Sequence, residues 1–270
     1  MSDPTPSTPW QRALVTGASA GIGRAFAERL AADGVDLVIV ARRGDRLDEL
    51  ARTLGRSGGR AVEVEEIVAD LATPAGVATV AARLAADDRP VDLLVNNAGV
   101  GRMGPAVDGD PATETAMVAV NVAALHQLSL AAARGMAARG RGAIVNVSSV
   151  AGFLTTPRTA TYGATKAFVT SFSTSLAAEL ADRGVTVTCL CPGLTRSEFH
   201  DRAGYDTTAY PGWAWQSPAA VAAAGLLGAA GGKVTVIPGA HNRALVGLAN
   251  LVPTRLRRRV EVLVDRSERR

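Results

Sequence analysis

The segment Ala13-Leu14-Val15-Thr16-Gly17-Ala18-Ser19-Ala20-Gly21-Ile22-Gly23 decides the fold. It leads from a short apolar run through three glycines into a helical pattern that begins near residue 22. Glycines permit a tight turn and let backbone N–H groups approach a pyrophosphate at the positive end of a helix. Ordinary strand–helix turns also contain glycines, but this turn follows the first predicted strand and opens the first predicted helix. We therefore predict cofactor contacts at Gly17, Ser19, Ala20, Gly21, Ile22 and Gly23.

Short β-rich runs alternate with longer, Ala-rich helical patterns along the rest of the chain. Runs such as Leu37-Val38-Ile39-Val40 are apolar without alternation, as expected of strands that helices cover on both faces. The alternation predicts an α/β fold, a doubly wound parallel sheet of about seven strands with helices on both faces. The predicted strands are 13–16, 35–41, 61–68, 91–96, 143–148, 185–191 and 233–237, and the predicted helices lie near 22–33, 45–54, 74–86, 112–138, 160–182 and 218–229.

The length of 270 residues suits one domain, because α/β folds beyond about 200 residues commonly form a single unit. We place this domain at 11–240, after a Pro-containing leader at 1–10 that we expect to be disordered. The segment 241–270 is predicted to be a C-terminal extension with a basic amphipathic helix. Such a helix packs more often on its own protein or on a second subunit than on an anionic membrane surface.

The positive charge of the chain is concentrated near its end. Residues 255–270 contain seven Arg and three acidic residues, a balance of +4 that equals the net charge of the whole chain. The other 254 residues contain 22 basic and 22 acidic groups. A neutral body lacks the basic face that nucleic-acid binding needs, so we exclude nucleic acid as a partner.

Cysteine and histidine content bears on compartment and metal binding. Cys189 and Cys191 lie two apart in a predicted strand, and we expect small core residues in a reducing compartment rather than a secreted disulfide scaffold. His126, His200 and His241 lack acidic or cysteine partners at ligand spacing, so we predict no metal site. No secretory signal is visible, and Pro and Gly break the longest uncharged run, 207–232. A cytoplasmic protein is therefore expected.

Two arginines at the end of the second predicted strand bear on the choice of dinucleotide. An acid at this position binds the adenosine ribose hydroxyls of NAD, whereas Arg binds the 2′-phosphate of NADP. The sequence there is Val40-Ala41-Arg42-Arg43, and the first acid is Asp45, in the next turn. Two solvated arginines would be unremarkable in an Arg-rich protein, but we favour NADP(H), with NAD(H) as the alternative.

Further motifs occur in a recognisable order along the chain. They are the TGxxxGxG turn at 16–23, Asp70-Leu71, Asn96-Asn97-Ala98-Gly99 after the fourth strand, the set Asn121, Ser149, Tyr162 and Lys166, and Pro192-Gly193. In these motifs the sequence resembles the compact, single-domain short-chain dehydrogenase/reductase family, over roughly 11–240. The resemblance implies a Rossmann fold and a homodimer or homotetramer that pairs through helices 112–138 and 160–182. It departs at Ala20, where many NADP-dependent members carry a basic residue.

The same resemblance assigns residues to the cofactor. In the family, Asp70 and Leu71 match the pair that holds the adenine ring, and Pro192-Gly193 matches the turn beside the nicotinamide. Cofactor contacts are also expected at Asn97, Ala98, Gly99, Tyr162, Lys166, Thr195 and Ser197.

Tyr162 and Lys166 carry the expected chemistry. They are four residues apart on a predicted helix and so share one face. A phenol has an ordinary pKa of about 10, and a neighbouring ammonium favours its phenolate. Lys166 is also one of only two lysines beside 27 arginines, so its position is informative. We predict Tyr162 as the general acid/base.

Two other residues complete the expected catalytic set. Ser149 ends the fifth predicted strand and can hold the substrate oxygen against the phenol, whereas Ser148 points to the other face and is structural. By family resemblance, Asn121 opens a hydrated proton path through Lys166.

Aromatic residues gather after Pro192-Gly193. Phe199, Tyr205, Tyr210, Trp213 and Trp215 are five of the chain's eleven aromatics and lie within seventeen residues. We predict a long irregular segment that forms a lid over an apolar substrate, although an anchoring cluster or a subunit contact is the alternative. The predicted substrate contacts are Ser149, Phe153, Tyr162, Phe199, Trp213 and Trp215.

Together these features predict an NADP(H)-dependent oxidoreductase that interconverts a ketone or aldehyde with an alcohol, acting on a small, hydrophobic substrate. Two alternatives stay open. One is an NAD-dependent epimerase or dehydratase of the related extended type, whose larger C-terminal region is missing here. The other is a dinucleotide-sensing regulatory protein without turnover, which has no need to keep Ser149 and Tyr162 together.

Overall fold

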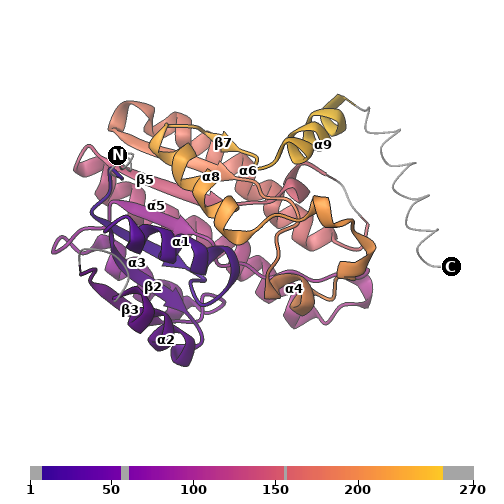
Figure 1. Cartoon of the computed structure of the whole chain (residues 1–270), viewed down its shortest axis with the longest axis horizontal. Coiled ribbons are helices and arrows are strands. Elements are labelled where there is room, and N and C mark those ends of the chain that lie inside the picture. Colours follow the sequence, from indigo (N-terminus) through magenta and orange to yellow (C-terminus); the bar gives the residue numbers. More distant parts are fainter. Residues whose placement is uncertain (1–7, 56–60, 155–156, 252–270) are drawn as a thin grey trace, which may run out of the picture.

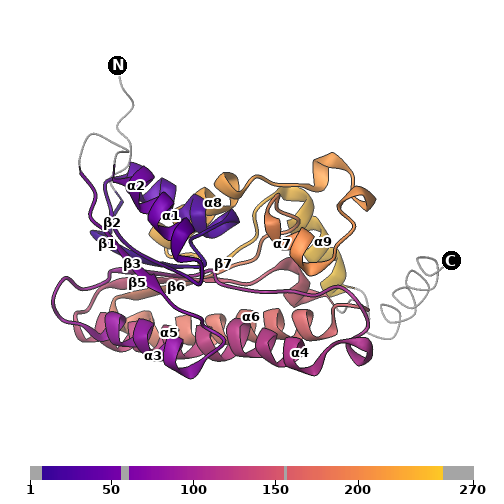
Figure 2. The same ribbon diagram turned by 90° about the horizontal axis from the view of Figure 1, so that it is seen from below.

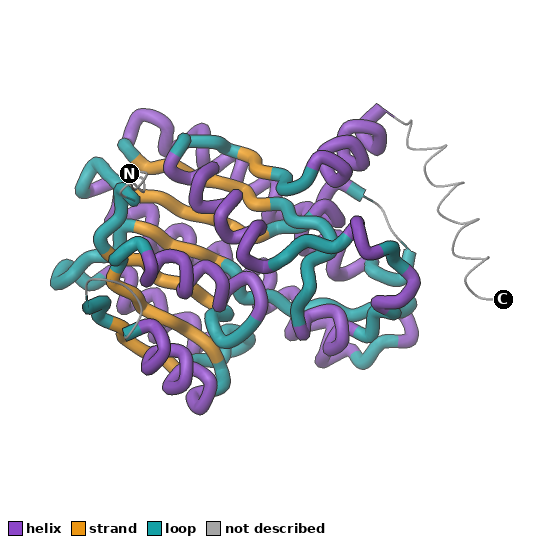
Figure 3. Tube along the Cα trace, viewed as in Figure 1, coloured by secondary structure: helices purple, strands orange, loops and turns teal. Residues whose placement is uncertain are grey.

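A parallel β-sheet organises the part of the chain that the computed structural model describes, residues 8–55, 61–154 and 157–251 (Figures 1 and 3). Its strand order is β3-β2-β1-β4-β5-β6-β7, and all neighbours are parallel. The predicted doubly wound fold is confirmed. The strands are β1 (Arg12–Thr16), β2 (Asp36–Ala41), β3 (Val64–Val68), β4 (Leu93–Asn96), β5 (Gly142–Val147), β6 (Val185–Leu190) and β7 (Thr235–Val236).

Two apolar layers hold helices against the sheet. Successive strand side chains point to opposite faces, so Val15 joins one layer and Leu14 the other. The first layer packs under α1 (Gly21–Ala32), α2 (Gly44–Leu54) and α8 (Pro218–Ala230); the second packs under α3 (Pro74–Ala85), α5 (Leu125–Ala138) and α6 (Ala160–Leu180). Figure 2 shows these two groups of helices on opposite sides of the sheet. Burial of each large apolar side chain contributes about 1.5–3 kcal/mol.

Three helices begin with the same local device, a polar cap followed by proline. Thr73, Asp110 and Ser217 accept a hydrogen bond from a backbone N–H of the first turn of α3, α4 (Pro111–Val118) and α8, and proline follows each of them. The cap satisfies a free donor, and proline has no N–H to lose at the first position. Helix α1 differs, because Ala20 precedes it and offers no side-chain cap. Its free N–H groups lie at the edge of the sheet that carries the site.

The predicted helix 112–138 is divided in the structure. It consists of α4 (Pro111–Val118), a π-helical segment η2 (Ala119–Ala124) and α5. The Asn121 side chain in η2 binds the backbone of Val100, a contact that sequence periodicity does not contain. Insertions of this type are frequent at functional sites.

The segment between β6 and α8 is more regular than predicted. It contains a short helix, α7 (Glu198–Ala203), and two single turns, η5 (Thr207–Ala209) and η6 (Gly212–Ala214). A further helix, α9 (Ala240–Leu251), follows β7. The remaining short helices are η1 (Ala106–Asp108), η3 (Val150–Phe153) and η4 (Ala181–Arg183).

The packed body extends beyond the predicted domain limits. Trp10, which we placed in the leader, is 7% exposed and belongs to the first apolar layer. Asn242 and Val246 of α9 are also buried, so the start of the predicted extension packs on the domain. Most of the leader and the basic segment after residue 251 lie outside the described residues.

One helical run in the described chain, Pro111–Ala138, is long and apolar enough to cross a membrane. Composition alone does not make it a membrane span, because Leu128, Ala132 and Met136 are buried in the second apolar layer. It is a core helix of this sheet.

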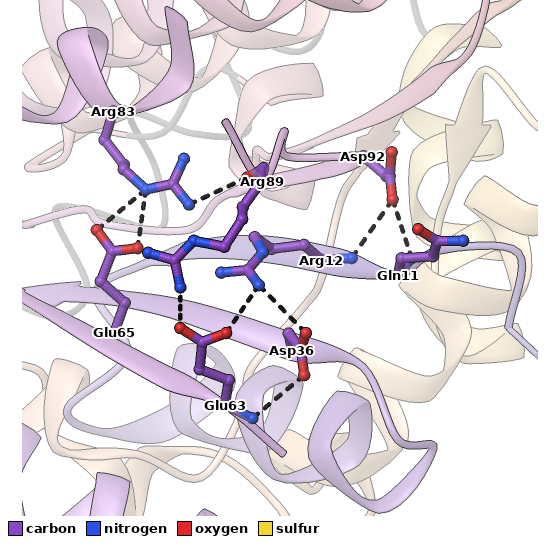
Figure 4. A network of polar contacts seen from close by, with 8 residues as sticks. All are labelled: Gln11, Arg12, Asp36, Glu63, Glu65, Arg83, Arg89 and Asp92. Carbon is purple, nitrogen blue, oxygen red and sulfur yellow. Dashed lines mark hydrogen bonds and ion pairs between the residues drawn. The ribbon is translucent and has the colours of Figure 1, made fainter. Parts of the chain in front are cut away.

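A polar network joins the amino ends of the strands, at the edge opposite the site (Figure 4). Arg12 is 6% exposed, and its Nη2 donates to Asp36 Oδ2 at 3.2 Å and to Glu63 Oε2 at 3.1 Å. Asp92 Oδ2 accepts from the backbone N of Gln11 at 3.0 Å. These contacts link β1 to β2 and to the segments before β3 and β4. They therefore hold four neighbouring strands together at that edge.

A second network lies inside the second apolar layer. Asn96 Nδ2 donates to Asn146 Oδ1 at 2.9 Å and to Ser129 Oγ at 3.0 Å, and Asn146 Nδ2 donates to Ser173 Oγ at 3.0 Å. All four residues are at most 3% exposed. Each polar group therefore depends on the others for a partner. The network ties the ends of β4 and β5 to α5 and to α6, and α6 carries Tyr162 and Lys166 of the site.

Substituting Ser173 by alanine tests this network. The Asn146 amide loses an acceptor inside the protein, so Ser173→Ala should lower the free energy of unfolding by about 1–3 kcal/mol. The control is Ser175→Ala, an exposed position on the same helix, which should change it by less than about 0.5 kcal/mol. Urea unfolding of the three proteins measures both effects. Equal stability of the two variants would contradict the role of the network.

Candidate active site

A cavity of about 810 Å³ lies at the carboxyl edge of the sheet, around the position where strand order switches from β1 to β4. In open α/β sheets, ligands bind at this switch point. Residues that follow six consecutive strands line it: Gly17, Arg42, Ala69, Asn97, Ser149 and Pro192. The motifs found along the sequence therefore meet in one place.

The glycine turn packs too tightly for side chains. A Cβ on Gly17, where φ is +67°, would lie 2.8 Å from Asn97 Nδ2 and 2.9 Å from Ala98 Cα. Gly23 does not line the cavity; its Cβ would lie 2.3 Å from the carbonyl oxygen of Gly17, so its role is to allow close packing of α1. The uncapped N-terminus of α1 faces the open side of the turn. This cradle fits a pyrophosphate.

Asn97 and Thr16 hold the turn in place. Asn97 Nδ2 donates to the carbonyl oxygen of Thr16 at 2.9 Å, and Thr16 Oγ1 accepts from the backbone N of Asn97 and of Ala98 at 3.0 Å each. The Asn97 side chain is thus occupied within the protein. Its contribution to a cofactor site is the position of the backbone at 97–99.

Arg42 and Arg43 line the outer part of the cavity, with Asp70 and Leu71 on the neighbouring loop. Arg43 Nη2 donates to Ser19 Oγ at 3.2 Å, which connects the end of β2 to the glycine turn. Burial and the nearby cations Arg202 and Arg46 lower the pKa of Arg43. A bound anion at this point would relieve the repulsion between Arg43 and the nearby arginines Arg202 and Arg46. The residues present therefore fit a ribose phosphate.

Tyr162 and Lys166 lie on α6 beneath the cavity and are 9% and 5% exposed. Lys166 Nζ donates to the carbonyl oxygen of Val147 at 2.9 Å and lies 5.7 Å from the centre of the Tyr162 ring. Burial raises the pKa of Tyr162 well above its ordinary value, and a hydrogen bond with Ser149 opposes that rise. Burial lowers the pKa of Lys166 to about 8. At neutral pH the pair is therefore a phenol beside an ammonium group.

The two serines after β5 both border the cavity but have different hydrogen-bond partners. Ser149 lines the cavity, and its Oγ accepts from the backbone N of Ala151 at 3.1 Å. Ser148 is 2% exposed, and its Oγ donates to the carbonyl oxygen of Lys166 at 2.8 Å. Ser148 thus stabilises the helix that carries Tyr162.

Asn121 does not line the cavity, although we predicted a catalytic role for it. Its Oδ1 accepts from the backbone N of Val100, and its Nδ2 donates to the carbonyl oxygen of Val100, both at 2.9 Å. Nδ2 also donates to Thr165 Oγ1 at 3.1 Å. A Cβ on Gly99 would lie 3.4 Å from Asn121 Oδ1 and 3.5 Å from Lys166 Nζ, so the two groups border the same backbone segment.

The segment 196–216 forms a lid whose two ends are joined. Thr195 and Gln216 form a parallel bridge, with Gln216 N donating to Leu194 O at 2.9 Å. Asn242 from α9 supports this base, because its Nδ2 donates to Gln216 Oε1 at 3.0 Å. Phe199 lies over the site with its ring 5.6 Å from that of Tyr162.

Two predicted substrate contacts do not border the cavity. Phe153 does not line it, whereas its neighbours Val150, Ala151 and Leu154 do. Trp215 does not line it either; it packs against His200, with ring centres 4.9 Å apart, and against the guanidinium of Arg196. Phe199 and Trp213 line the cavity as predicted.

The other predicted contacts all line the cavity, Gly23 and Asn121 excepted. They are Gly17, Ser19, Ala20, Gly21, Ile22, Arg42, Arg43, Asp70, Leu71, Asn97, Ala98, Gly99, Ser149, Tyr162, Lys166, Pro192, Gly193, Thr195 and Ser197. Sequence reasoning missed Met103, Leu154, Glu198, His200, Arg202, His241, Asn242 and Leu245. Most of these lie on the lid or on α9, where the only sequence signal was the run of aromatics.

The two cysteines lie in the core near this region. Cys189 and Cys191 are buried and free, with their sulfur atoms 3.5 Å apart. Among the described residues, no group of three or more His, Cys, Asp or Glu side chains could hold a metal ion.

Comparison with known proteins places the chain among dehydrogenases. A family model for short chain dehydrogenases matches residues 11–207. Galactitol 2-dehydrogenase (L-tagatose-forming) of Cereibacter sphaeroides is 42% identical over 188 residues, which cover 69% of this chain and 72% of that protein.

Solved structures agree with this comparison. A short-chain dehydrogenase from Sphingobium yanoikuyae in complex with NADPH has a TM-score of 0.80 and 38% identity, covering 90% of this chain and 96% of that one. A bulky-bulky ketone specific alcohol dehydrogenase from Comamonas testosteroni has a TM-score of 0.76 and 34% identity, covering 90% of this chain and 95% of that one.

Replacing Lys166 by methionine should change how stability depends on pH in the cofactor-free protein. Between pH 8 and the ordinary value of 10.5, the unfolded chain binds more protons at this residue than the folded chain. The unfolding free energy of the wild type should therefore rise relative to that of Lys166→Met from pH 8 to pH 10, by up to about 3 kcal/mol.

Urea unfolding across this range measures the difference. The matched control is Lys233→Met, which removes the chain's only other lysine, an exposed one whose charge stays in water. A constant difference between the wild type and Lys166→Met would show that burial does not disfavour the ammonium group.

Proposed function

Because the chain belongs to the short-chain dehydrogenase/reductase family, we propose that this oxidoreductase uses NADP(H) to reduce bulky, apolar ketones. One observation carries the proposal. Tyr162 faces a cavity that has an uncapped glycine turn and two arginines at one end and an aromatic lid at the other. The first end fits a phosphorylated dinucleotide, and the second fits an apolar substrate.

The choice of NADP(H) rests on the residues after β2. Arg42 and Arg43 line the cavity where the adenosine ribose of a dinucleotide would lie, and an arginine there pairs with a 2′-phosphate. Ser19 adds a hydroxyl bonded to Arg43, which offers a further donor to a phosphate oxygen. The Sphingobium yanoikuyae neighbour, whose structure contains NADPH, supports the same choice. NAD(H) remains the weaker alternative because it lacks the phosphate.

The side chains of the site move a proton while the cofactor supplies the hydride. Ser149 Oγ holds the carbonyl oxygen of the substrate, and the Tyr162 hydroxyl donates a proton to that oxygen as negative charge develops. Burial keeps the phenol protonated, which is the form that carbonyl reduction requires. Lys166 is cationic below about pH 8 and favours the phenolate left after transfer.

The lid end of the cavity supports an apolar substrate. Met103, Leu154, Phe199, Trp213 and Leu245 line it. A polyol or sugar acid has several hydroxyl groups that such walls would leave without partners. Among the similar solved structures, the Comamonas testosteroni enzyme is named for bulky-bulky ketones. We therefore assign a ketone with two large apolar substituents rather than a sugar.

An exposed aromatic surface on the second helical layer supports assembly. Phe168 of α6 is 38% exposed and stacks on Phe172 at 5.7 Å, and the His126 ring of α5 lies 5.1 Å from Phe172. Apolar groups in this position are typical of contacts between subunits. We propose a homodimer or homotetramer formed through α5 and α6.

Replacing Tyr162 by phenylalanine should abolish most turnover and leave NADPH binding nearly intact. The variant loses only the proton donor, so kcat should fall by about 10²–10⁴ while the Kd for NADPH changes by less than about twofold. Steady-state rates and calorimetry measure the two quantities. The control is Tyr205→Phe, which removes another phenol of the cavity and should keep most turnover. Substantial activity in Tyr162→Phe would require a different acid.

The two lid tryptophans should respond differently to truncation. Trp213 lines the cavity, so Trp213→Ala should raise KM for bulky apolar ketones by at least about threefold with little effect on NADPH affinity. Trp215 packs on His200 within the lid, so Trp215→Ala should lower unfolding free energy by about 2–4 kcal/mol. Kinetics and thermal unfolding of both variants provide the measurement. A loss of stability in Trp213→Ala with KM unchanged would remove the substrate assignment.

A further inference from the structure

Glu198 connects the lid to the arginines at the cofactor end of the cavity. It is the first residue of α7, and it lines the cavity together with Arg43 and Arg202. Arg46 Nη1 donates to Glu198 Oε1 at 2.7 Å, and Arg43 Nη1 lies 3.6 Å from Glu198 Oε2. Arg202 Nη2, one turn along α7, also pairs with Glu198 Oε2. A carboxylate from residue 198 thus meets guanidinium groups that follow β2.

Glu198 is an ionised carboxylate at neutral pH. The hydrogen bond from Arg46 and the positive charges of Arg202, Arg46 and Arg43 lower its pKa. The base of the lid is also tightly placed against the glycine turn, because a Cβ on Gly21 would lie 3.0 Å from Ser197 Cβ. The anion next to Arg43 is therefore held there by the fold of the lid as well as by attraction.

Arg43 is the residue to which the proposed function assigns the 2′-phosphate. A carboxylate and a phosphate use the same chemistry, oxygen anions that accept from guanidinium N–H groups. They also repel one another when they share one arginine. We infer that Glu198 is a specificity-determining residue, whose carboxylate competes with the 2′-phosphate of NADPH for Arg43 and so limits the preference for NADPH over NADH. The inference rests on the proposed function, because it presupposes a 2′-phosphate at Arg43.

Glu198 lies at unequal distances from Arg43 and Arg46, so it can lose Arg43 to a phosphate and still hold the lid through Arg46. Glu198 is 0.9 Å closer to Arg46 than to Arg43, since the two separations are 2.7 and 3.6 Å. A phosphate that takes Arg43 therefore leaves Glu198 its shorter contact with Arg46. The lid keeps an anchor on α2, while the carboxylate weakens the binding of the phosphate by repulsion.

Binding measurements on Glu198→Gln test the inference without turnover. The substitution removes the charge and preserves the size of the side chain. It should tighten NADPH binding by about three- to tenfold and change NADH binding by less than about twofold, because only NADPH carries the phosphate. Calorimetry gives the Kd of each cofactor, and the quantity compared is the ratio of the Kd for NADH to the Kd for NADPH. The matched control is Glu28→Gln on α1, which removes an exposed carboxylate paired with Arg24, does not line the cavity and should leave the ratio unchanged.

An unchanged ratio of the two Kd values in Glu198→Gln would overturn the role of Glu198. If both Kd values also shifted by the same factor, the glutamate would only position the lid. Failure of the proposed function has a different signature. If the wild type bound NADH as tightly as NADPH but the ratio still rose in Glu198→Gln, the cofactor preference would be wrong and the competition at Arg43 would stand.

Discussion

The site depends on one close contact, between the glycine turn after β1 and the backbone after β4. Asn97 Nδ2 occupies the space that a Cβ on Gly17 would need, and Thr16 Oγ1 accepts from two N–H groups on the opposing segment. This contact bridges β1 and β4, the neighbouring strands at which the order of strand addition across the sheet reverses. It therefore sets where the N-terminus of α1 lies relative to the residues after β4, on which the shape of the cavity depends.

The two ends of that cavity differ in how deeply their titratable side chains are buried. At the catalytic end, burial favours a neutral phenol on Tyr162 and lowers the pKa of Lys166 to about 8. At neutral pH, Tyr162 can therefore donate a proton, and Lys166 carries a positive charge beside it. At the cofactor end, the arginines are half-exposed and share one carboxylate. Charges there remain available to an incoming anion. Under the proposed function, proton transfer and phosphate recognition therefore lie at separate ends of one cleft.

Features fixed by local sequence were predictable, and features fixed by tertiary contacts were not. The seven strands and the glycine turn follow from apolar runs and from backbone sterics. The π-helical segment η2 arises because Asn121 binds Val100, a partner 21 residues away. Trp213, which borders the cavity and is 72% exposed, could not be told apart from Trp215, which packs on His200, since a lid without regular periodicity does not reveal the contacts of each side chain. Glu198 was missed because its partners on α2 are more than 150 residues away in sequence.

We propose that this cleft brings NADPH and an apolar ketone together. Initial rates of nicotinamide absorbance change, measured for bulky diaryl or alkyl-aryl ketones and for ketoses with each reduced cofactor, test it most directly. The account predicts the highest kcat/KM for a bulky apolar ketone with NADPH, at least about tenfold above the same ketone with NADH. A higher kcat/KM for a ketose, or equal values with the two cofactors, would contradict it.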